Sequence, residues 1–131
     1  MLPMQHEELT RKIIGCAYKI YNAMGFGFLE SVYEKCMIIE LVKLGLEFKE
    51  QYPITVHYEG HVVGEFFADL WVEDAVIVEL KSVRAIATAH ETQLVNYLKS
   101  TGKDVGLLLN FGESKVEVKR KMRELPRSIE E

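Results

Sequence analysis

Two stretches with helical spacing open the chain. Over residues 7–24 and again over residues 30–44, apolar positions recur at steps of three or four, so that each stretch has one apolar face. Gly25 and Gly45 follow these stretches directly, as glycine often does at a helix C-terminus. We therefore expect two amphipathic helices. The apolar stripe of the first contains Leu9, Ile13, Ala17, Ile20 and Met24, and that of the second contains Leu29, Val32, Cys36 and Ile39.

After residue 53 the apolar positions alternate with polar ones, as in a strand with one buried face. Further along, a nearly continuous apolar run is typical of a strand buried on both faces. The charged tail from Lys121 onward is expected to fray. The sequence predicts three strands, a helix, a buried strand and an edge strand over these ranges: 54–58, 62–72, 76–83, 89–100, 105–110 and 115–119.

This order of elements, ααβββαβ(β), predicts an α/β fold with a central mixed sheet flanked by helices. Strands joined by tight turns pair antiparallel, whereas a helical crossover joins two parallel strands. The 131 residues contain no internal repeat and no linker-like segment, and their number suits one domain. We therefore expect residues 1–131 to form a single domain.

Composition narrows the class of protein. Apolar residues make up 48% of the chain and charged residues 27%, which is the balance of a globular protein. No apolar run reaches the ~20 residues that span a membrane, and the polar N-terminus lacks a secretory signal. Cys16 and Cys36 have neither metal-site nor redox spacing. A cytoplasmic protein with two reduced, buried thiols and no membrane contact is expected.

The formal net charge of −4 is unusual for a protein that binds nucleic acid, because phosphates favour a basic surface. Net charge hides local patches, however, and a carboxylate cluster becomes less negative once it holds a cation. A basic segment near the C-terminus is either a nucleic-acid contact or a solvated strand and tail. Its residues are Lys115, Lys119, Arg120, Lys121 and Arg123.

Three charged residues interrupt two strongly apolar strands. Glu79 and Lys81 are two apart and share one face of their strand, and Asp69 lies on the strand before it. Buried charges are costly unless they pair or bind something. One interpretation is a structural salt bridge between Lys81 and a carboxylate. The other is a metal and phosphate site, with the two carboxylates as oxygen ligands and Lys81 as a charge that positions water or phosphate.

The second interpretation sets a geometric condition on the connection between the two strands. With a two-residue connection, Glu73-Asp74, Asp69 faces Val78 and Glu79 points to the other side of the sheet. With a three-residue connection that includes Ala75, Asp69 lies opposite Glu79. A metal site therefore requires an odd connection or a bulge.

Four motifs in order make the chain resemble a known family. Asp69 followed by Glu79-Leu80-Lys81 is similar to the signature of the PD-(D/E)XK nuclease superfamily, although Ala68 stands where the proline of that name would be. Gln93 and Tyr97 fit the Q-x-x-x-Y motif of several branches. Residues 27–33, Gly-Phe-Leu-Glu-Ser-Val-Tyr, match the G-x-x-E-x-x-Y pattern that names a small family within it.

The resemblance, which extends over about residues 6–119, implies a restriction-endonuclease-like core. It implies that Asp69, Glu79 and Glu30 are metal ligands for Mg²⁺ or Mn²⁺ and that Lys81 is the catalytic lysine. It also implies catalytic roles for Glu30, Gln93 and Tyr97. The expected activity is hydrolysis of phosphodiester bonds in nucleic acid, with DNA favoured over RNA. The alternative is a nuclease-fold binding or assembly module without turnover, and such a minimal core can act as a homodimer.

Several of these residues can also be interpreted as purely structural. Glu30 in the first turn of a helix is stabilised by the helix dipole, by ~0.3–1 kcal/mol. Tyr33 either orients a carboxylate through its hydroxyl or is a half-buried aromatic. His90, Gln93 and Tyr97 share a helix face, which either meets the charged end of the sheet or faces solvent. His57 and His61 flank a turn and are expected at an exposed hairpin end rather than a second metal site.

Overall fold

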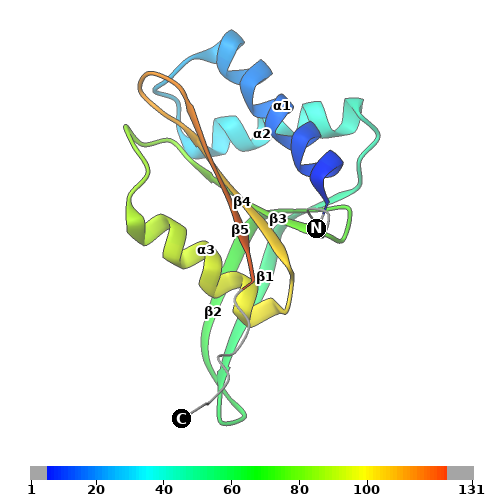
Figure 1. Ribbon diagram of the computed structural model, residues 1–131, viewed down its shortest axis with the longest axis vertical. Helices are drawn as coiled ribbons and strands as arrows, with labels where there is room; N and C mark the ends of the chain where they lie inside the picture. Colours follow the sequence, from blue (N-terminus) through cyan, green and yellow to red (C-terminus); the bar gives the residue numbers. More distant parts are fainter. Residues whose placement is uncertain (1–5, 124–131) are drawn as a thin grey trace, which may run out of the picture.

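Helices cover both faces of a single five-stranded sheet in the computed structural model, which describes residues 6–123 (Figure 1). The sheet order is β1-β2-β3-β4-β5, and all neighbours are antiparallel except β3 and β4, which α3 joins as a parallel crossover. The elements are α1 Glu7–Met24, α2 Glu30–Lys43, β1 Phe48–Tyr58, β2 His61–Val72, β3 Val76–Lys81, α3 Thr88–Thr101, β4 Val105–Phe111 and β5 Val116–Met122. The predicted α/β fold and order of elements are confirmed.

The alternation of side chains divides the core into two layers. Leu80 and its alternate neighbours on β3 pack with α1 and α2, whereas Ile77, one residue out of phase, packs with Leu94 and Leu98 of α3. Glu79 and Lys81 are in phase with Ile77 and so belong to the α3 side. The candidate site therefore lies on the face of the sheet that α3 covers.

Three strand boundaries differ from those that the sequence predicts. β1 starts at Phe48, not at residue 54, because a strand at the edge of a sheet tolerates a proline such as Pro53. β3 ends at Lys81, not at residue 83, because the Asn110 side chain binds both the N–H and the C=O of Val83. β5 continues to Met122, so the tail does not fray from residue 121; residues 124–131 lie outside the described part.

The expectations for the cysteines and for two histidines can be compared with the structure. Both cysteines are free, as expected, but only Cys16 is buried, whereas Cys36 is half-buried. His57 and His61 are exposed and flank the β1–β2 turn, at the end of a hairpin that projects past α3 (Figure 1). Within residues 6–123, no helix is long and apolar enough to cross a membrane.

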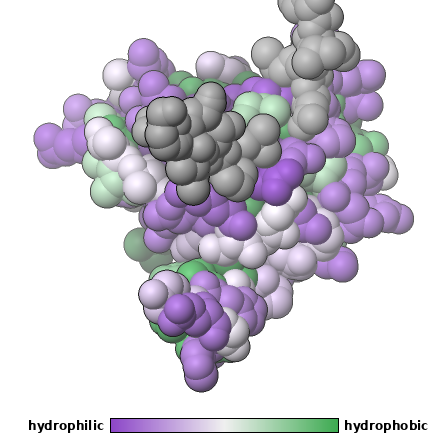
Figure 2. Space-filling model, turned by 60° about the horizontal axis from the view of Figure 1, so that its bottom comes forward, coloured by the Kyte–Doolittle hydropathy of each residue, from purple (hydrophilic) through white to green (hydrophobic). Residues whose placement is uncertain are grey.

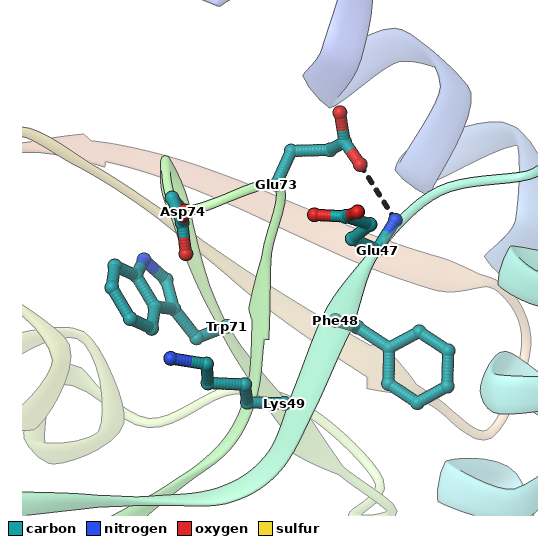
Figure 3. Close-up of a pocket in the computed structure, with 6 residues that line it drawn as sticks. All are labelled: Glu47, Phe48, Lys49, Trp71, Glu73 and Asp74. Carbon is teal, nitrogen blue, oxygen red and sulfur yellow. Dashed lines mark hydrogen bonds between the residues drawn. The ribbon is translucent and has the colours of Figure 1, made fainter.

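The turn between β2 and β3 has three residues, and its shape is held by contacts to β1. Glu73 and Asp74 take left-handed conformations with φ of 54° and 53°. The Glu73 carboxylate accepts a hydrogen bond from the Glu47 N–H at 2.6 Å, and the Glu73 N–H donates to the Glu47 carbonyl at 2.8 Å (Figure 3). Val72 pairs with Val76 across the turn. The connection is therefore odd, as the metal-site hypothesis requires.

Replacing Glu73 tests whether this contact stabilises the turn. Glu73→Ala removes the acceptor of the Glu47 N–H and should lower the free energy of unfolding by about 1 kcal/mol. Glu73→Gln keeps an oxygen acceptor and has the same backbone conformation, so most of the stability should return. Urea denaturation of the three proteins measures the difference. Equal losses in both variants would contradict a role for the hydrogen bond.

Candidate functional site

Asp69 and Glu79 lie where the β2–β3 ladder ends. The last residue pair of the ladder is Leu70 with Val78, and the same register sets Asp69 opposite Glu79. The Asp69 N–H donates to Glu79 Oε1 at 3.1 Å, and the Leu80 N–H donates to Asp69 Oδ2 at 2.7 Å. Each carboxylate thus accepts a backbone hydrogen bond from the opposite strand. This reciprocal pairing fixes both side chains side by side.

The chain is also irregular on the other side of Asp69. Ala68 and Trp71 are three apart yet both pack on the α3 side, so the alternation along β2 is interrupted at Asp69. On β1, Gln51 stands between partners of Leu70 and Ala68, and it has a left-handed φ of 49°. Local irregularity of this kind re-aims a side chain out of the regular pleat.

Burial of the two carboxylates shifts their titration. Glu79 is 5% exposed, and burial followed by the charge of Asp69 raises its pKa to about 8. Burial also raises the pKa of Asp69, against the Leu80 hydrogen bond and the positive charge of Lys81. Within residues 6–123, no ion pair within 4 Å joins Lys81 to either carboxylate. The two carboxyl groups are therefore adjacent and largely shielded from water, and the Lys81 ammonium is near them without forming an ion pair.

This donor set fits a hard divalent cation. Carboxylate oxygens are the ligands of Mg²⁺ and Mn²⁺, and Mg²⁺ commonly takes only one or two protein carboxylates while water and phosphate complete its shell. Among residues 6–123, no group of three or more His, Cys, Asp or Glu side chains is arranged to hold a metal. Asp69 and Glu79 form an adjacent pair of carboxylates of the kind that such an ion uses.

Glu30 is the first residue of α2 and is exposed, and its charge contributes to the raised pKa of Glu79. The loop before it is held against the end of β3, because the Ser82 hydroxyl donates to the Phe28 carbonyl at 2.6 Å. A carboxylate is therefore brought near the Asp69–Glu79 pair from the other helical layer. No ligand role for Glu30 follows from this contact alone.

Tyr33 supports that loop rather than a carboxylate. Its ring is fully buried and stacks on Phe111, with ring centres 4.1 Å apart. Its hydroxyl donates to the Gly25 carbonyl and accepts from the Phe28 N–H at 3.4 Å. Of the two interpretations of Tyr33, the buried aromatic agrees with the structure. The motif therefore combines an acidic residue, Glu30, with Tyr33, the residue that anchors the loop before α2.

The sequence pattern did not predict two residues that lie next to the site, Gln51 and Glu34. The Gln51 amide donates to Glu34 Oε1 at 2.8 Å and also holds down the pKa of Asp69. Burial raises the pKa of Glu34, and the charge of Asp69 adds to this rise. Glu34 could have been found, because it is four residues after Glu30 and shares its helix face. Gln51 could not, since only the pairing of β1 with β2 brings it to Asp69.

The three polar candidate residues on α3 have different surroundings. Tyr97 is buried, and after burial itself the charges of Glu79 and Asp69 raise its pKa, so it lies near the carboxylates. Gln93 is half-buried, and no hydrogen bond in residues 6–123 joins it to the charged residues of the site. His90 caps the helix, with Nδ1 accepting from the Ala87 N–H at 3.1 Å. Of these three residues, Tyr97 is the one whose pKa the two carboxylates affect.

The basic segment near the C-terminus is largely engaged within the fold. Lys121 pairs with Glu91 at 2.7 Å, and Arg123 pairs with Asp104 at 3.0 Å. Both residues lie on or just after β5, at the edge of the sheet. This agrees with the interpretation as a solvated strand better than with a free basic arm.

Comparison with known proteins gives a family and a fold. Residues 7–121 match the family model described as the PD-(D/E)XK nuclease superfamily. The chain resembles the crystal structure of SSO0001 with a TM-score of 0.57 and 16% identity, over 92% of this chain and 61% of that one. It resembles an alkaline exonuclease (LHK-Exo) from Laribacter hongkongensis with a TM-score of 0.51 and 9% identity, over 93% and 73%.

These structural likenesses show the fold, which is the restriction-endonuclease-like α/β arrangement expected from the sequence. The chain spans less than two thirds of the length of SSO0001. No curated protein sequence matches it significantly.

The raised pKa of Glu79 predicts how stability depends on pH. Between about pH 4.5 and 8 the unfolded chain has released this proton while the folded protein keeps it, so the free energy of unfolding falls as pH rises and levels off above pH 8. Glu79→Gln cannot ionise, so it should lose most of this slope and be relatively more stable at pH 9. Asp69 and Glu34 shift in the same direction and should leave a smaller slope.

Urea denaturation across pH 5 to 9, within and just above that window, measures the effect. Glu65→Gln is the matched control, because Glu65 is an exposed carboxyl on the same strand as Asp69. If the Glu79→Gln and wild-type proteins have parallel profiles, the carboxyl is already ionised in the folded protein and the argument from burial is wrong.

Proposed function

Because the chain belongs to the PD-(D/E)XK nuclease superfamily, we propose that it hydrolyses phosphodiester bonds of nucleic acid, DNA in preference to RNA, with Mg²⁺ or Mn²⁺. Nucleases of this superfamily typically use divalent metal ions. The G-x-x-E-x-x-Y pattern at residues 27–33 supports placing the chain in the small family named after it. The exonuclease with a similar fold adds general support for a nuclease.

The observation that carries the proposal is the reciprocal hydrogen bonding of Asp69 and Glu79. Their carboxylates are adjacent, with Glu79 buried and Asp69 half-buried, and the charge of Asp69 helps to raise the pKa of Glu79 to about 8. A divalent cation would relieve the repulsion between the two carboxylates, since it favours ionised oxygen ligands. When bound, such an ion polarises a phosphoryl oxygen and lowers the pKa of a bound water.

The surrounding residues have separate tasks in this proposal. Lys81 stabilises negative charge that develops on the phosphate and orients the attacking water, since its ammonium is close to both carboxylates without pairing with them. Glu30 adds a third carboxylate from α2. Tyr97 contacts the phosphate and Gln93 orients water or Lys81. In-line attack then breaks the phosphorus–oxygen bond on the far side of the phosphorus.

The remaining expectations from the sequence stay predictions. These are a cytoplasmic location and a homodimer. The alternative of a nuclease-fold module without turnover draws on the net charge of −4 and on the absence of a three-ligand group within residues 6–123. It makes the same prediction for the fold and a different one for metal binding.

Substitutions at the three charged residues test the proposal. Lys81→Ala should lower the rate of cleavage of DNA by about 10²–10³-fold while leaving Mn²⁺ binding in place. Asp69→Asn and Glu79→Gln should lose both cleavage and Mn²⁺ binding. Calorimetry with Mn²⁺ and gel assays on DNA and RNA with Mg²⁺ or Mn²⁺ measure the two properties. Lys12→Ala is the control, because Lys12 is an exposed lysine on α1, which packs on the face of the sheet opposite to α3.

The outcomes separate the two functions. Cleavage that survives Lys81→Ala unchanged would assign the activity to a contaminant or another site. Mn²⁺ binding without cleavage of any substrate would keep the metal centre and contradict the nuclease activity. Absence of Mn²⁺ binding by the wild-type protein would contradict the metal centre and favour the module without turnover.

A further inference from the structure

A groove of about 640 Å³ lies between the β1–β2 hairpin and α3. The hairpin projects past the helix, and hydrophobic surface lies at the base of the projecting lobe when the molecule is seen from that end (Figures 1 and 2). Pockets of roughly 300–1,000 Å³ hold one small organic ligand, which is the size range of a nucleotide. The groove is lined by Val56 and Phe66 of the hairpin and by Thr88, Ala89, Thr92, Gln93, Asn96, Tyr97, Lys99 and Ser100 of α3.

One wall of the groove is aromatic. The rings of Phe66 and Tyr97 are 5.8 Å apart and tilted by 38°, so they form a continuous apolar surface. Phe66 is 44% exposed although it is a large hydrophobic residue, whereas Tyr97 is buried beneath it. Gln93 and Asn96, on the same helix as Tyr97, also line the groove and carry amide groups. Aromatic faces and amide edges together are what bind a nucleic-acid base, by stacking and by hydrogen bonds to its edge.

The charge of the groove differs from that of the chain as a whole. None of its lining residues is a carboxylate and one is a lysine, whereas the chain has a formal net charge of −4. The pocket at the β2–β3 turn is the opposite case, with the carboxylates of Glu47, Glu73 and Asp74 around Lys49 and Trp71 (Figure 3). Of the two, only the groove beside α3 is compatible with a polyanion.

Tyr97 relates the groove to the candidate catalytic site. Tyr97 lines the groove, and it also lies within the electrostatic influence of Glu79 and Asp69. A nucleic-acid strand whose phosphate lies at the carboxylates would therefore bring an adjacent base to the aromatic wall. In a duplex both faces of that base are covered by its neighbours, so only an unpaired or flipped base can stack on a protein ring.

We propose that this groove binds an unpaired nucleotide of a single-stranded nucleic acid, with its base stacked on Phe66, next to the phosphate that is cleaved. The proposal rests on the proposed nuclease function and names its substrate class: single strands, or duplex ends that have frayed. Phe66 is a specificity-determining residue, because it recognises the base and leaves the metal ligands untouched. Gln93, to which the proposed function assigns the orientation of water or Lys81, also lines this groove.

Binding of a fluorescent single strand tests the proposal. The probe is a short single-stranded DNA with one 2-aminopurine, whose emission is quenched by stacking, in Ca²⁺, which uses the same type of oxygen ligands. The wild-type protein should quench it and bind it more tightly than the blunt duplex of the same sequence. Phe66→Leu keeps an apolar side chain but loses the ring, so single-strand affinity should fall by about fivefold to 100-fold.

Phe67→Leu is the matched control. Phe67 is the adjacent residue, is 58% exposed and does not line the groove, so its replacement should change the affinity by less than about twofold. Urea denaturation of both variants checks that they are folded. Equal affinities for single strand and duplex, or equal effects of the two substitutions, would overturn the proposal.

Two further readouts distinguish a base-binding groove from damage to the metal site and from a dimer interface. Mn²⁺ calorimetry on Phe66→Leu should match the wild-type protein, so loss of the metal site is scored apart from loss of the groove. If wild-type protein binds Mn²⁺ and cleaves blunt duplex as well as single strands, the nuclease function stands and the groove proposal fails. If sedimentation shows a wild-type dimer that Phe66→Leu dissociates, the groove is an interface between two copies, and the proposal is wrong.

Discussion

The carboxylates of Asp69 and Glu79 each accept a backbone hydrogen bond from the opposite strand, and this arrangement depends on a turn that is one residue longer than the tightest hairpin. Because side chains alternate along a strand, a change of one residue in that turn would move Glu79 away from Asp69. The turn keeps its length through two left-handed residues and through the contacts of Glu73 with the start of β1. The site is therefore fixed from a point several residues away, by backbone geometry rather than by the acids themselves.

The surroundings of the two carboxylates disfavour their ionised forms. Burial raises the pKa of both, and the charge of Asp69 raises the pKa of Glu79 further, so their ionised forms destabilise the folded protein near neutral pH. Backbone N–H groups that lack strand partners offset part of this cost, and so does the charge of Lys81. A cation would offset the remainder. Groups held in an unfavourable charge state by a well-ordered backbone are typical of functional sites, although structural networks can also have this property.

The negative charge of the chain is distributed unevenly in the folded protein. Negative charge gathers near Asp69, where Glu79, Glu30 and Glu34 approach from two layers, and again at the β2–β3 turn. The face between the hairpin and α3 is free of carboxylates in its lining. Net charge thus says little about where a polyanion could bind, because the distribution of charge over the surface decides it.

The sequence by itself determined the order of the elements, the α/β class and the identity of the three central charged residues. Local periodicity and turn residues are sufficient for the elements, since each depends on near neighbours in the chain. The charges of Asp69, Glu79 and Lys81 stood out because apolar strands rarely contain such residues. The spacing of Glu30 and Tyr33 was visible too, although the sequence left the task of Tyr33 open between a carboxylate and the core.

Tertiary structure alone decided which residues meet. Gln51 reaches Asp69 through strand pairing, Tyr33 binds a loop carbonyl, and Asn110 ends β3 by capturing Val83. Each of these contacts joins side chains to groups whose position is set by the packing of several elements, so no local pattern encodes it. The three-residue turn between β2 and β3 could be predicted only in part. Its two possible lengths were visible in the sequence, and only the pairing of β2 with β3 selected the one that sets Asp69 beside Glu79.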